Sequence, residues 1–338
     1  MILPPDSHTP LRGGATQRWG ILAPGGIADD WTAALHTHTD QRVVAVASRS
    51  LERAQAFAGK HGIAQAYGSY EQLVADPTVD VVYIAPPHTE HLKLALLAIA
   101  AGKHVLVEKP IGISADEART LAEAARAAGV FAMEAMWSRF LPQTTVVDAL
   151  LRDGALGDVL TVTADFGAVF DTDPNGRAYN PALGGGALLD VGVYPAWFAH
   201  FVKGAPQRVT ASGSLTSTGV DAQAAVILDY ADHGQALLTT SMLVATPLAA
   251  TISGTAARVD YPHEFMGPSS FRVLVDEKVV AEYSDPNGFR WRDGLSYQAV
   301  AVAQHIADGL TESPLHTLDD TIAVLDVLDA ARAQVGVA

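Results

Sequence analysis

Three glycines, one acid and one phenol stand together in the stretch GGGALLDVGVYP, residues 184–195. Asp190 and Tyr194 are four positions apart, so on a helix their side chains lie on one face. A phenol in such a position suits a general acid or base, and a carboxylate suits the binding of a hydroxyl group. A loop followed by an ordinary core helix explains the same residues. In that case Asp190 interacts favourably with the positive end of the helix dipole. The stretch alone does not decide between these two interpretations.

A second stretch with chemical potential is the glycine-rich turn APGGIA (23–28), which follows the apolar run RWGIL and opens a helical pattern. The backbone N–H groups at a helix N-terminus suit a pyrophosphate. Gly25 lets the backbone approach the phosphates, and Ala28 is small enough for the helix to pack on the strand. Ala23 stands where a Rossmann fingerprint has its first glycine, which weakens the match. A ligand-free loop remains the alternative, but the strand context favours dinucleotide binding.

The end of the second apolar run, QRVVAVASR (41–49), indicates which dinucleotide is bound. NAD-specific sites usually place Asp or Glu here to hold the ribose 2′-OH, whereas this chain has Ser48 and Arg49. Arg49 can pair with a 2′-phosphate, and a charge-assisted bond of this kind contributes about 1.5–3 kcal/mol. A solvated arginine at the start of a helix is the alternative. We predict NADP as the coenzyme, with NAD possible.

His88 and His91 have the HxxH spacing of some metal sites. They lie where a strand pattern turns into a helical one, so capping and coenzyme contact explain them better. We predict no metal.

Short apolar runs alternate with helical patterns up to about residue 139, which predicts an α/β fold with a doubly wound parallel sheet. After about residue 140, polar and apolar residues alternate as in antiparallel strands, and two helices follow near 294–309 and 318–335. We therefore expect three parts. They are a poorly ordered tail at 1–16, a Rossmann NADP-binding domain at 17–139 and a substrate-binding and dimerisation domain at 140–338.

Two serines are expected to begin helices in the first domain. Ser50 precedes one helical pattern, and Ser114 with Glu117 three residues on forms a capping box. Gly129 is expected to end the second of these helices.

The composition narrows the classes of function. The 338 residues are 49% hydrophobic, and 22 basic against 37 acidic residues give a net charge of −15. This balance argues against binding to nucleic acid or to anionic membranes, because both depend on Lys and Arg. Cysteine is absent, which excludes disulfides and thiolate chemistry. With no apolar run of about 20 residues and no signal-like start, we expect a cytoplasmic protein.

The stretch VLVEKPIG (105–112) resembles the EKP motif of the Gfo/Idh/MocA oxidoreductases. The resemblance spans about residues 18–335 and includes YIAPPHTEH, AMEAMWSRFLP, GGGALLDVGVYP and SPLHTLDDTIAVLDVLDAAR. Tyr194, where many relatives have His, points to the branch of dimeric dihydrodiol dehydrogenases and NADP-dependent D-xylose dehydrogenases. The resemblance implies a Rossmann domain followed by an α/β domain with an open, mostly antiparallel sheet. That sheet often forms a dimer interface, so a homodimer or homotetramer is expected.

The resemblance also implies roles for individual residues. A hydride moves between the nicotinamide and a carbinol carbon, and Tyr194 acts as general acid or base. A free tyrosine titrates near pH ~10, too high for a base at neutral pH. Lys109 fits as the neighbouring ammonium that favours the phenolate, and Asp190 binds a substrate hydroxyl or orients Lys109. Structural roles for all three residues remain the alternative.

The other implied contacts divide between coenzyme and substrate. The coenzyme-binding residues are expected to be Ala23, Gly25, Gly26, Ile27, Ser48, Arg49, Arg53, Pro86, His88, His91, Glu108 and Lys109. The substrate-binding residues are expected to be Trp137, Arg139, Phe166, Tyr179 and Asp190. Phe166 fits simple packing equally well. The three glycines are expected to form a pliant loop, and Pro195 predicts a bend next to Tyr194.

The expected activity is an NAD(P)-dependent dehydrogenase or reductase that acts on CH–OH groups of a sugar, a sugar derivative or a cyclic diol. Two alternatives remain open. One is a non-catalytic, NADP-sensing or protein-binding member of the same fold, which would have no need of the Lys109–Tyr194 pair. The other is redox-assisted cleavage of a glycoside or sugar.

Overall fold

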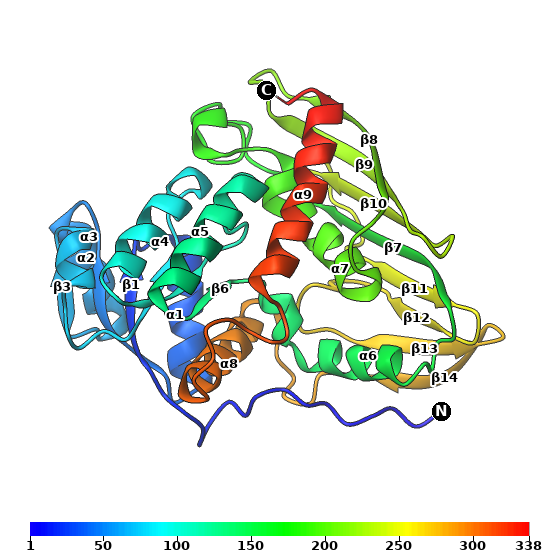
Figure 1. Cartoon of the computed structure of the whole chain (residues 1–338), viewed down its shortest axis with the longest axis horizontal. Helices are drawn as coiled ribbons and strands as arrows, with labels where there is room; N and C mark the ends of the chain where they lie inside the picture. The colour runs from blue at the N-terminus through cyan, green and yellow to red at the C-terminus, as the bar shows by residue number, and fades with distance from the viewer. Residues whose placement is uncertain (338) are drawn as a thin grey trace. The chain divides into compact units, whose positions relative to one another are not determined.

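The computed structural model describes residues 1–337, which form two compact units interleaved along the chain (Figure 1). The Rossmann unit contains His8–Phe140 and Trp291–Thr321, and the sheet unit contains Met1–Ser7, Leu141–Arg290 and the chain from Ile322 onward. The sequence predicted a single division near residue 140. The structure has a division at that point, but it also assigns 291–321 to the first unit.

The Rossmann unit is built on a six-stranded parallel sheet in the order β3-β2-β1-β4-β5-β6. This is the strand order of a doubly wound dinucleotide-binding fold, so the predicted fold class is confirmed. The strands are β1 (Arg18–Leu22), β2 (Arg42–Ala47), β3 (Gln65–Tyr67), β4 (Val81–Ile84), β5 (His104–Val107) and β6 (Ala132–Glu134). The sequence did not predict β3 or the five-residue helix after it, since neither has a clear apolar period.

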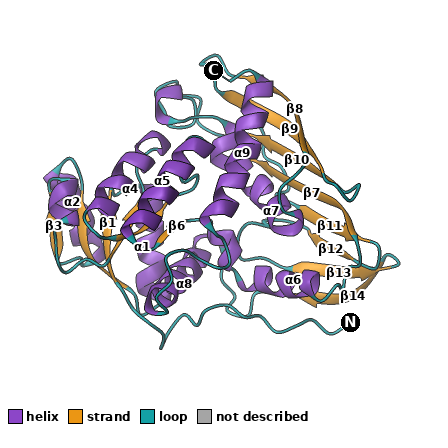
Figure 2. Cartoon of the chain, in the orientation of Figure 1, coloured by secondary structure: helices purple, strands orange, loops and turns teal. Residues whose placement is uncertain are grey.

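Helices cover both faces of this sheet, as Figures 1 and 2 show. They are α1 (Gly26–His38), α2 (Leu51–His61), α3 (Tyr70–Val74), α4 (His91–Ala100) and α5 (Ala115–Ala128), and α8 (Leu295–Ala307) packs on α1. Ser50 and Ser114 cap α2 and α5 as predicted. Glu117 completes the second cap by accepting from Ile113 N at 2.8 Å, and Gly129 ends α5 with a φ of 66°.

The strands next to the centre of this sheet end at one level. The register aligns Leu22 with Ala47 on one side and with Ile84 on the other, and Ile84 aligns with Val107. The residues that follow each strand therefore emerge at the same carboxyl edge, where the strand order reverses between β1 and β4. Doubly wound folds bind their ligands at such an edge.

The sheet unit holds an eight-stranded sheet in the order β14-β13-β12-β11-β7-β10-β9-β8. All neighbours are antiparallel except β7 and β10, which confirms the mostly antiparallel sheet. The strands are β7 (Val159–Gly167), β8 (Arg208–Leu215), β9 (Asp221–Asp229), β10 (Gln235–Ser241), β11 (Ala250–Gly254), β12 (Arg258–Tyr261), β13 (Phe271–Val275) and β14 (Lys278–Tyr283).

Helices of the sheet unit lie against one face of its sheet (Figure 1). They are α6 (Pro142–Arg152), α7 (Val193–Lys203) and, from Ile322 on, α9 (Leu318–Val335). Leu328 of α9 and Ala196 of α7 line one small apolar cavity with Val226 and Leu238 of the sheet. This face of the sheet is therefore the core of the unit.

The residues before β1 form no helix or strand, but they make specific hydrogen bonds. Arg12 pairs with Asp40 at 3.0 Å, and Gly13 N donates to the same carboxylate at 2.8 Å. Gln41 accepts from Gln17 N and donates to Ala15 O. These bonds fix the segment to the α1–β2 connection, which the composition of the tail did not indicate.

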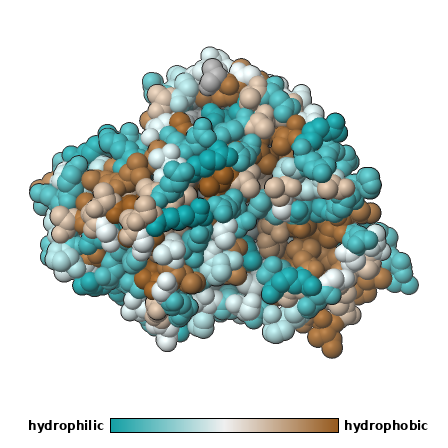
Figure 3. Space-filling model, in the orientation of Figure 1, coloured by the Kyte–Doolittle hydropathy of each residue, from teal (hydrophilic) through white to brown (hydrophobic). Residues whose placement is uncertain are grey.

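No helix within residues 1–337 is long and apolar enough to cross a membrane. The face of the molecule visible in Figure 3 is largely hydrophilic, with separate hydrophobic areas between.

Candidate active site

The glycine-rich turn lies at the carboxyl edge of the Rossmann sheet. Ala23 adopts a φ of 64°, a conformation that favours glycine, so the fingerprint position keeps its geometry without its usual residue. Gly25 is the N-cap of α1 and no side chain caps the helix there. A Cβ added at Gly25 or Gly26 would meet no atom within 4 Å. The turn thus offers exposed backbone N–H groups in open space, which fits a pyrophosphate.

The end of β2 lies at the same edge. Ser48 is buried, and its N–H donates to Tyr67 O at 3.2 Å. Arg49 and Arg53 are exposed. Arg49 lines an open cavity of about 690 Å³ together with Tyr70 of α3 and Lys93 of α4. The two arginines are therefore accessible to an anion, whereas Ser48 mainly joins β2 to β3.

The histidine pair lies after β4. His91 is fully buried, with Nδ1 2.7 Å from Pro110 O and Nε2 3.0 Å from Pro86 O. Burial lowers the pKa of His91 to about 4, although both carbonyls favour the protonated ring. His88 lies 5.6 Å away, ring to ring, in a T-shaped contact. His91 thus connects the β4 and β5 loops and is not available to a metal. Within residues 1–337, no group of three or more His, Cys, Asp or Glu could hold a metal ion.

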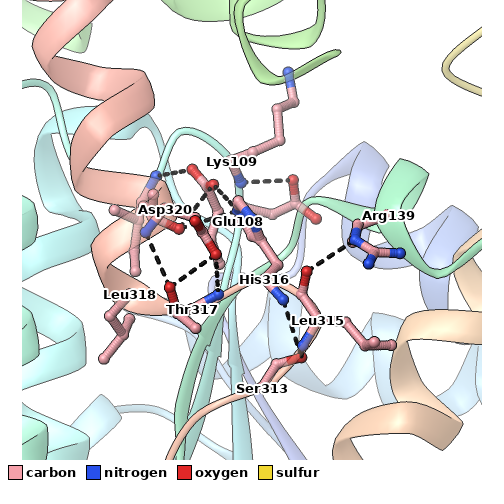
Figure 4. A network of polar contacts seen from close by, with 12 residues as sticks. Glu108, Lys109, Arg139, Ser313, Leu315, His316, Thr317, Leu318 and Asp320 are labelled. Atoms are coloured by element: carbon pink, nitrogen blue, oxygen red, sulfur yellow. Dashed lines mark hydrogen bonds and ion pairs between the residues drawn. The ribbon is translucent and has the colours of Figure 1, made fainter. Parts of the chain in front are cut away.

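Residues 108–111, called here the Lys109 loop, continue β5. Glu108 is buried, accepts a short hydrogen bond from Tyr83 OH and accepts from Lys109 N at 3.2 Å. Burial raises the pKa of the Glu108 carboxyl, and the hydrogen bond from Tyr83 opposes that rise. Glu108 was predicted as a coenzyme contact, but its carboxylate is engaged within the protein. Figure 4 shows the side chain of Lys109 extending away from the surrounding network.

A buried network that the sequence did not reveal lies behind this loop. Glu134, 1% exposed at the end of β6, accepts from Ile111 N at 3.0 Å. Its other oxygen lies 3.1 Å from His316 Nε2 and 3.2 Å from Thr321 Oγ1. Figure 4 shows His316 within the polar contacts of residues 313–320. A Glu inside an apolar strand was the only available signal for this network.

Trp137 and Arg139 lie in a short 3-10 helix, η2 (Trp137–Phe140), directly after β6. Trp137 is 2% exposed and contacts Trp291 edge to face. Arg139 is 7% exposed, and its Nε donates to Leu315 O at 2.8 Å (Figure 4). One donor of Arg139 is therefore engaged within the Rossmann unit, which the prediction of a substrate contact did not anticipate.

Tyr194 lies in the sheet unit, at the start of α7. A π-helical turn, η4 (Leu188–Gly192), precedes the helix, so the irregularity falls before Pro195 rather than at it. π-turns inside helices are frequent at functional sites. Tyr194 is 4% exposed and stacks on Phe166 of β7 with ring centroids 5.4 Å apart. Phe166 thus packs against the phenol that we single out.

Asp190 occupies the middle of the π-turn and is 6% exposed. Its Oδ1 lies 2.8 Å from Arg177 Nη1, a partner from the preceding loop that the sequence did not indicate. Because a π-turn is wider than an α-turn, Asp190 and Tyr194 do not have the regular spacing that the sequence predicted. Tyr179, also from that loop, is buried at 6% exposure.

The glycines at 184–186 are required for close packing. A Cβ at Gly185 would lie 2.6 Å from Ala178 O, and Gly184 has a φ of 73°. The expectation of a pliant loop is therefore replaced by a tightly packed one. We refer to residues 184–194 as the Tyr194 turn.

Comparison with known proteins identifies the family. Residues 18–136 match the model of the oxidoreductase family with an NAD-binding Rossmann fold, and residues 145–260 match the GFO/IDH/MocA C-terminal domain. The chain is 40% identical over 328 residues to a trans-1,2-dihydrobenzene-1,2-diol dehydrogenase of Xenopus laevis, covering 95% of this chain and 98% of the relative. The chain belongs to the Gfo/Idh/MocA oxidoreductases. Membership makes it a nicotinamide-dependent oxidoreductase, as predicted.

Other relatives agree with this assignment. The human trans-1,2-dihydrobenzene-1,2-diol dehydrogenase is 38% identical over 326 residues, covering 95% of this chain and 97% of the relative. A crystal structure of a 3-ketoreductase from Actinomadura kijaniata, in complex with NADP and TDP-benzene, has a TM-score of 0.82 at 26% identity. The match covers 94% of this chain and 98% of that one.

Proposed function

We propose that this oxidoreductase transfers a hydride between NADP(H) and a carbinol or carbonyl carbon of a sugar, a sugar derivative or a cyclic diol. The observation that carries the proposal is the placement of Lys109 beyond β5, whose last residue, Val107, is in register with Ile84 and Leu22. Lys109 thus emerges at the edge that carries the exposed glycine turn. The identity to dihydrodiol dehydrogenases over nearly the whole chain supports the substrate class.

The nicotinamide, when bound, supplies the hydride acceptor or donor. The protein must then manage one proton and the developing charge on oxygen. In the oxidative direction the substrate O–H proton passes to the Tyr194 phenolate as the C–H hydride leaves, and in the reductive direction the phenol returns it. Lys109 stabilises the phenolate by its positive charge. Asp190, held by Arg177 at 2.8 Å, accepts a hydrogen bond from a substrate hydroxyl.

NADP is the proposed coenzyme because Ser48 and Arg49 follow β2 directly, where NAD-specific sites usually have a carboxylate. Arg49 and Arg53 are both exposed, and Arg49 lines the cavity of about 690 Å³. Arg49→Asp is expected to weaken NADPH binding about ten- to a hundredfold more than NADH binding, because a 2′-phosphate loses its cation and meets an anion. Titration by coenzyme fluorescence measures both dissociation constants. Equal losses for the two coenzymes would refute the assignment.

The substrate pocket is proposed to use aromatic side chains as a platform. Trp137 and Tyr179, both buried, carry rings of the type that binds sugars and diols, and Phe166 supports Tyr194 by stacking. Arg139 fits a supporting role, since it already donates to Leu315 O. Trp137→Ala is the most direct test of this platform, because a ring that contacts substrate changes KM more than the coenzyme dissociation constant.

We propose that the chain forms a homodimer, or a tetramer built from such dimers, through the face of the eight-stranded sheet opposite its helices. Leu237 of β10 and Ile227 of β9 are directly paired across the strands, yet they are 43% and 37% exposed. Leu160 of β7 is 42% exposed. Leu237→Asp is expected to halve the mass measured by light scattering, and a wild-type monomer would contradict the proposal. We also propose that the protein is cytoplasmic.

The experiment that tests the function is a substrate screen. The purified protein is incubated with trans-1,2-dihydrobenzene-1,2-diol, aldoses such as D-xylose, inositols, anhydrosugars and glycosides, with NADP and in parallel with NAD. We expect coenzyme reduction with at least one sugar or diol and a preference for NADP. NADPH binding without turnover of any compound would favour the sensor, and release of an aglycone from a glycoside would favour redox-assisted cleavage.

A further inference from the structure

Asp221, the first residue of β9, is a buried carboxylate that contacts the Tyr194 turn from another element. Its side chain is 0% exposed, and Oδ2 accepts from Leu188 N at 2.6 Å. Leu188 is the first residue of the π-turn that contains Asp190. The carboxylate thus occupies the cap position of this helix, which has no side-chain cap of its own.

Gly186 is fitted to the same carboxylate. It has a φ of 124°, which strongly favours glycine, and an added Cβ would lie 2.3 Å from Asp221 Oδ1. The backbone of the turn therefore rests directly against Asp221. In addition, Gly186 O accepts from Asp190 N at 3.2 Å, so the residue against the carboxylate is hydrogen-bonded to Asp190.

The surroundings of the Asp221 carboxylate both oppose and favour its charged form. Burial raises the pKa of Asp221, while the N–H of Leu188 and the positive charge of Arg332 oppose the rise. A buried carboxylate is costly to desolvate. What the carboxylate supplies is a strong, directional acceptor at the start of the π-turn.

We propose that Asp221 is a positioning residue for the dehydrogenase reaction. By capping the π-turn through Leu188 N, it fixes the register of Asp190 and, four residues later, of the Tyr194 phenol. The proposal rests on the proposed function of Tyr194, but its structural part is independent of any substrate. A displacement of about 1 Å at a reacting group is enough to slow a reaction by up to a hundredfold.

The test compares Asp221→Ala and Asp221→Asn with a matched control, Asp165→Ala. Asp165 also caps backbone in the sheet unit, accepting from Leu248 N and Ala249 N at 2.9 and 3.0 Å, but in the loop that leads into β11. Hydrogen–deuterium exchange followed by mass spectrometry gives the substrate-independent readout. Asp221→Ala is expected to speed exchange in peptides covering 186–196, and Asp165→Ala in peptides covering 246–250 instead. Unchanged exchange at 186–196 in Asp221→Ala would overturn the cap.

Kinetics test the positioning role. With NADP and the substrate found by the screen, Asp221→Ala should lower kcat about tenfold or more, with an unchanged NADPH dissociation constant. Asp221→Asn, which keeps an acceptor oxygen, should restore most of kcat, and Asp165→Ala should leave it near wild type. All variants are assayed at a temperature where circular dichroism shows them folded. Faster exchange with an unchanged kcat would overturn the positioning role, whereas a wild type without turnover would refute the proposed function and leave the exchange result standing.

Discussion

The Lys109 loop and the Tyr194 turn are held in place by different means. The Lys109 loop is held by side chains from other strands and helices: Glu108 meets Tyr83, His91 meets the backbone of Pro110, and Glu134 meets the backbone of Ile111. The Tyr194 turn also has side-chain contacts, from Arg177 and Phe166, but it adds a close packing of backbone on backbone. There Gly185 lies against Ala178 O, and Asp221 is the side chain that caps the turn.

The two regions should therefore differ in the substitutions and pH changes that they tolerate. Side-chain hydrogen bonds can be weakened one at a time, and titratable groups among them respond to pH. The backbone contact between Gly185 and Ala178 has no such gradation, because one added methyl group already overlaps with the carbonyl. The ammonium and the phenol that we assign to one proton transfer thus depend on separate physical supports.

The largest effect is expected when either reacting group is removed. Lys109→Met and Tyr194→Phe should each lower kcat at least about a hundredfold, because general acid–base catalysis contributes about 10²–10⁴. NADPH binding should stay near wild type. Stopped-flow and steady-state kinetics measure the first quantity and fluorescence titration the second. Near-normal turnover in one variant would remove that residue from the mechanism. The region that holds it, the Lys109 loop or the Tyr194 turn, would then have no role in the proton transfer.

The next effect concerns the stability that one contact in each region contributes. Glu134→Ala leaves Ile111 N and His316 without their acceptor and should cost about 1–3 kcal/mol of unfolding free energy. Gly185→Ala forces a methyl group to within 2.6 Å of Ala178 O and should cost about 1–3 kcal/mol. Urea unfolding measures both. The exposed Glu123→Ala is the control, expected within about 0.5 kcal/mol of wild type. A Gly185→Ala variant as stable as this control would end the distinction between the two regions.

A smaller effect concerns pH. The folded pKa of His91, about 4, lies below its unfolded value of about 6.5. Below pH ~6.5 the unfolded chain binds a proton that the native state does not, so stability falls as the pH drops toward 4, by up to about 1.4 kcal/mol per pH unit. His91→Gln should have a shallower fall between pH 7 and pH 5 in urea unfolding. An identical slope in both proteins would show that the pKa of His91 is not lowered in the native state.

The smallest effect concerns Ala23, a position at the Rossmann edge where the backbone itself is strained. Ala23 has a φ of 64°, which costs a non-glycine residue about 1–2 kcal/mol. Ala23→Gly should therefore stabilise the protein by about 0.5–1 kcal/mol after the greater freedom of the unfolded chain is subtracted. Thermal unfolding measures it. Ala56→Gly in α2 should do the opposite, and a fall in stability for both would contradict the strain at Ala23.

The sequence predicted the parallel sheet well, because buried parallel strands are short apolar runs and their helices carry clear caps. It missed β3 and α3, where no such run exists. It did not assign residues 291–321 to the Rossmann unit, since that assignment depends on packing between distant segments. The antiparallel sheet was predicted as a type from alternation, whereas the parallel β7–β10 pair was not.

For the candidate site, the sequence indicates the positions of several residues but not the contacts that hold them. Ala23, Gly25 and Lys109 stand at strand ends that the sequence marks. The carboxylate networks around Glu134 and Asp221 were not predicted, because their partners are backbone N–H groups and, for Glu134, two side chains far along the chain, which no sequence pattern indicates. Arg177, the partner of Asp190, lies in a loop without periodicity. The three glycines were predicted to form a pliant loop. The atoms that require glycine there, Ala178 O and Asp221 Oδ1, belong to residues outside the turn.

The central claim is that Lys109 and Tyr194 serve one proton transfer although they belong to separately supported regions. The most direct test is the double variant, Lys109→Met with Tyr194→Phe, compared with each single variant in the same assay. Residues that act as a unit lose their effect together, so the double variant should turn over no more slowly than the slower single variant. Losses that multiply in the double variant would contradict the claim.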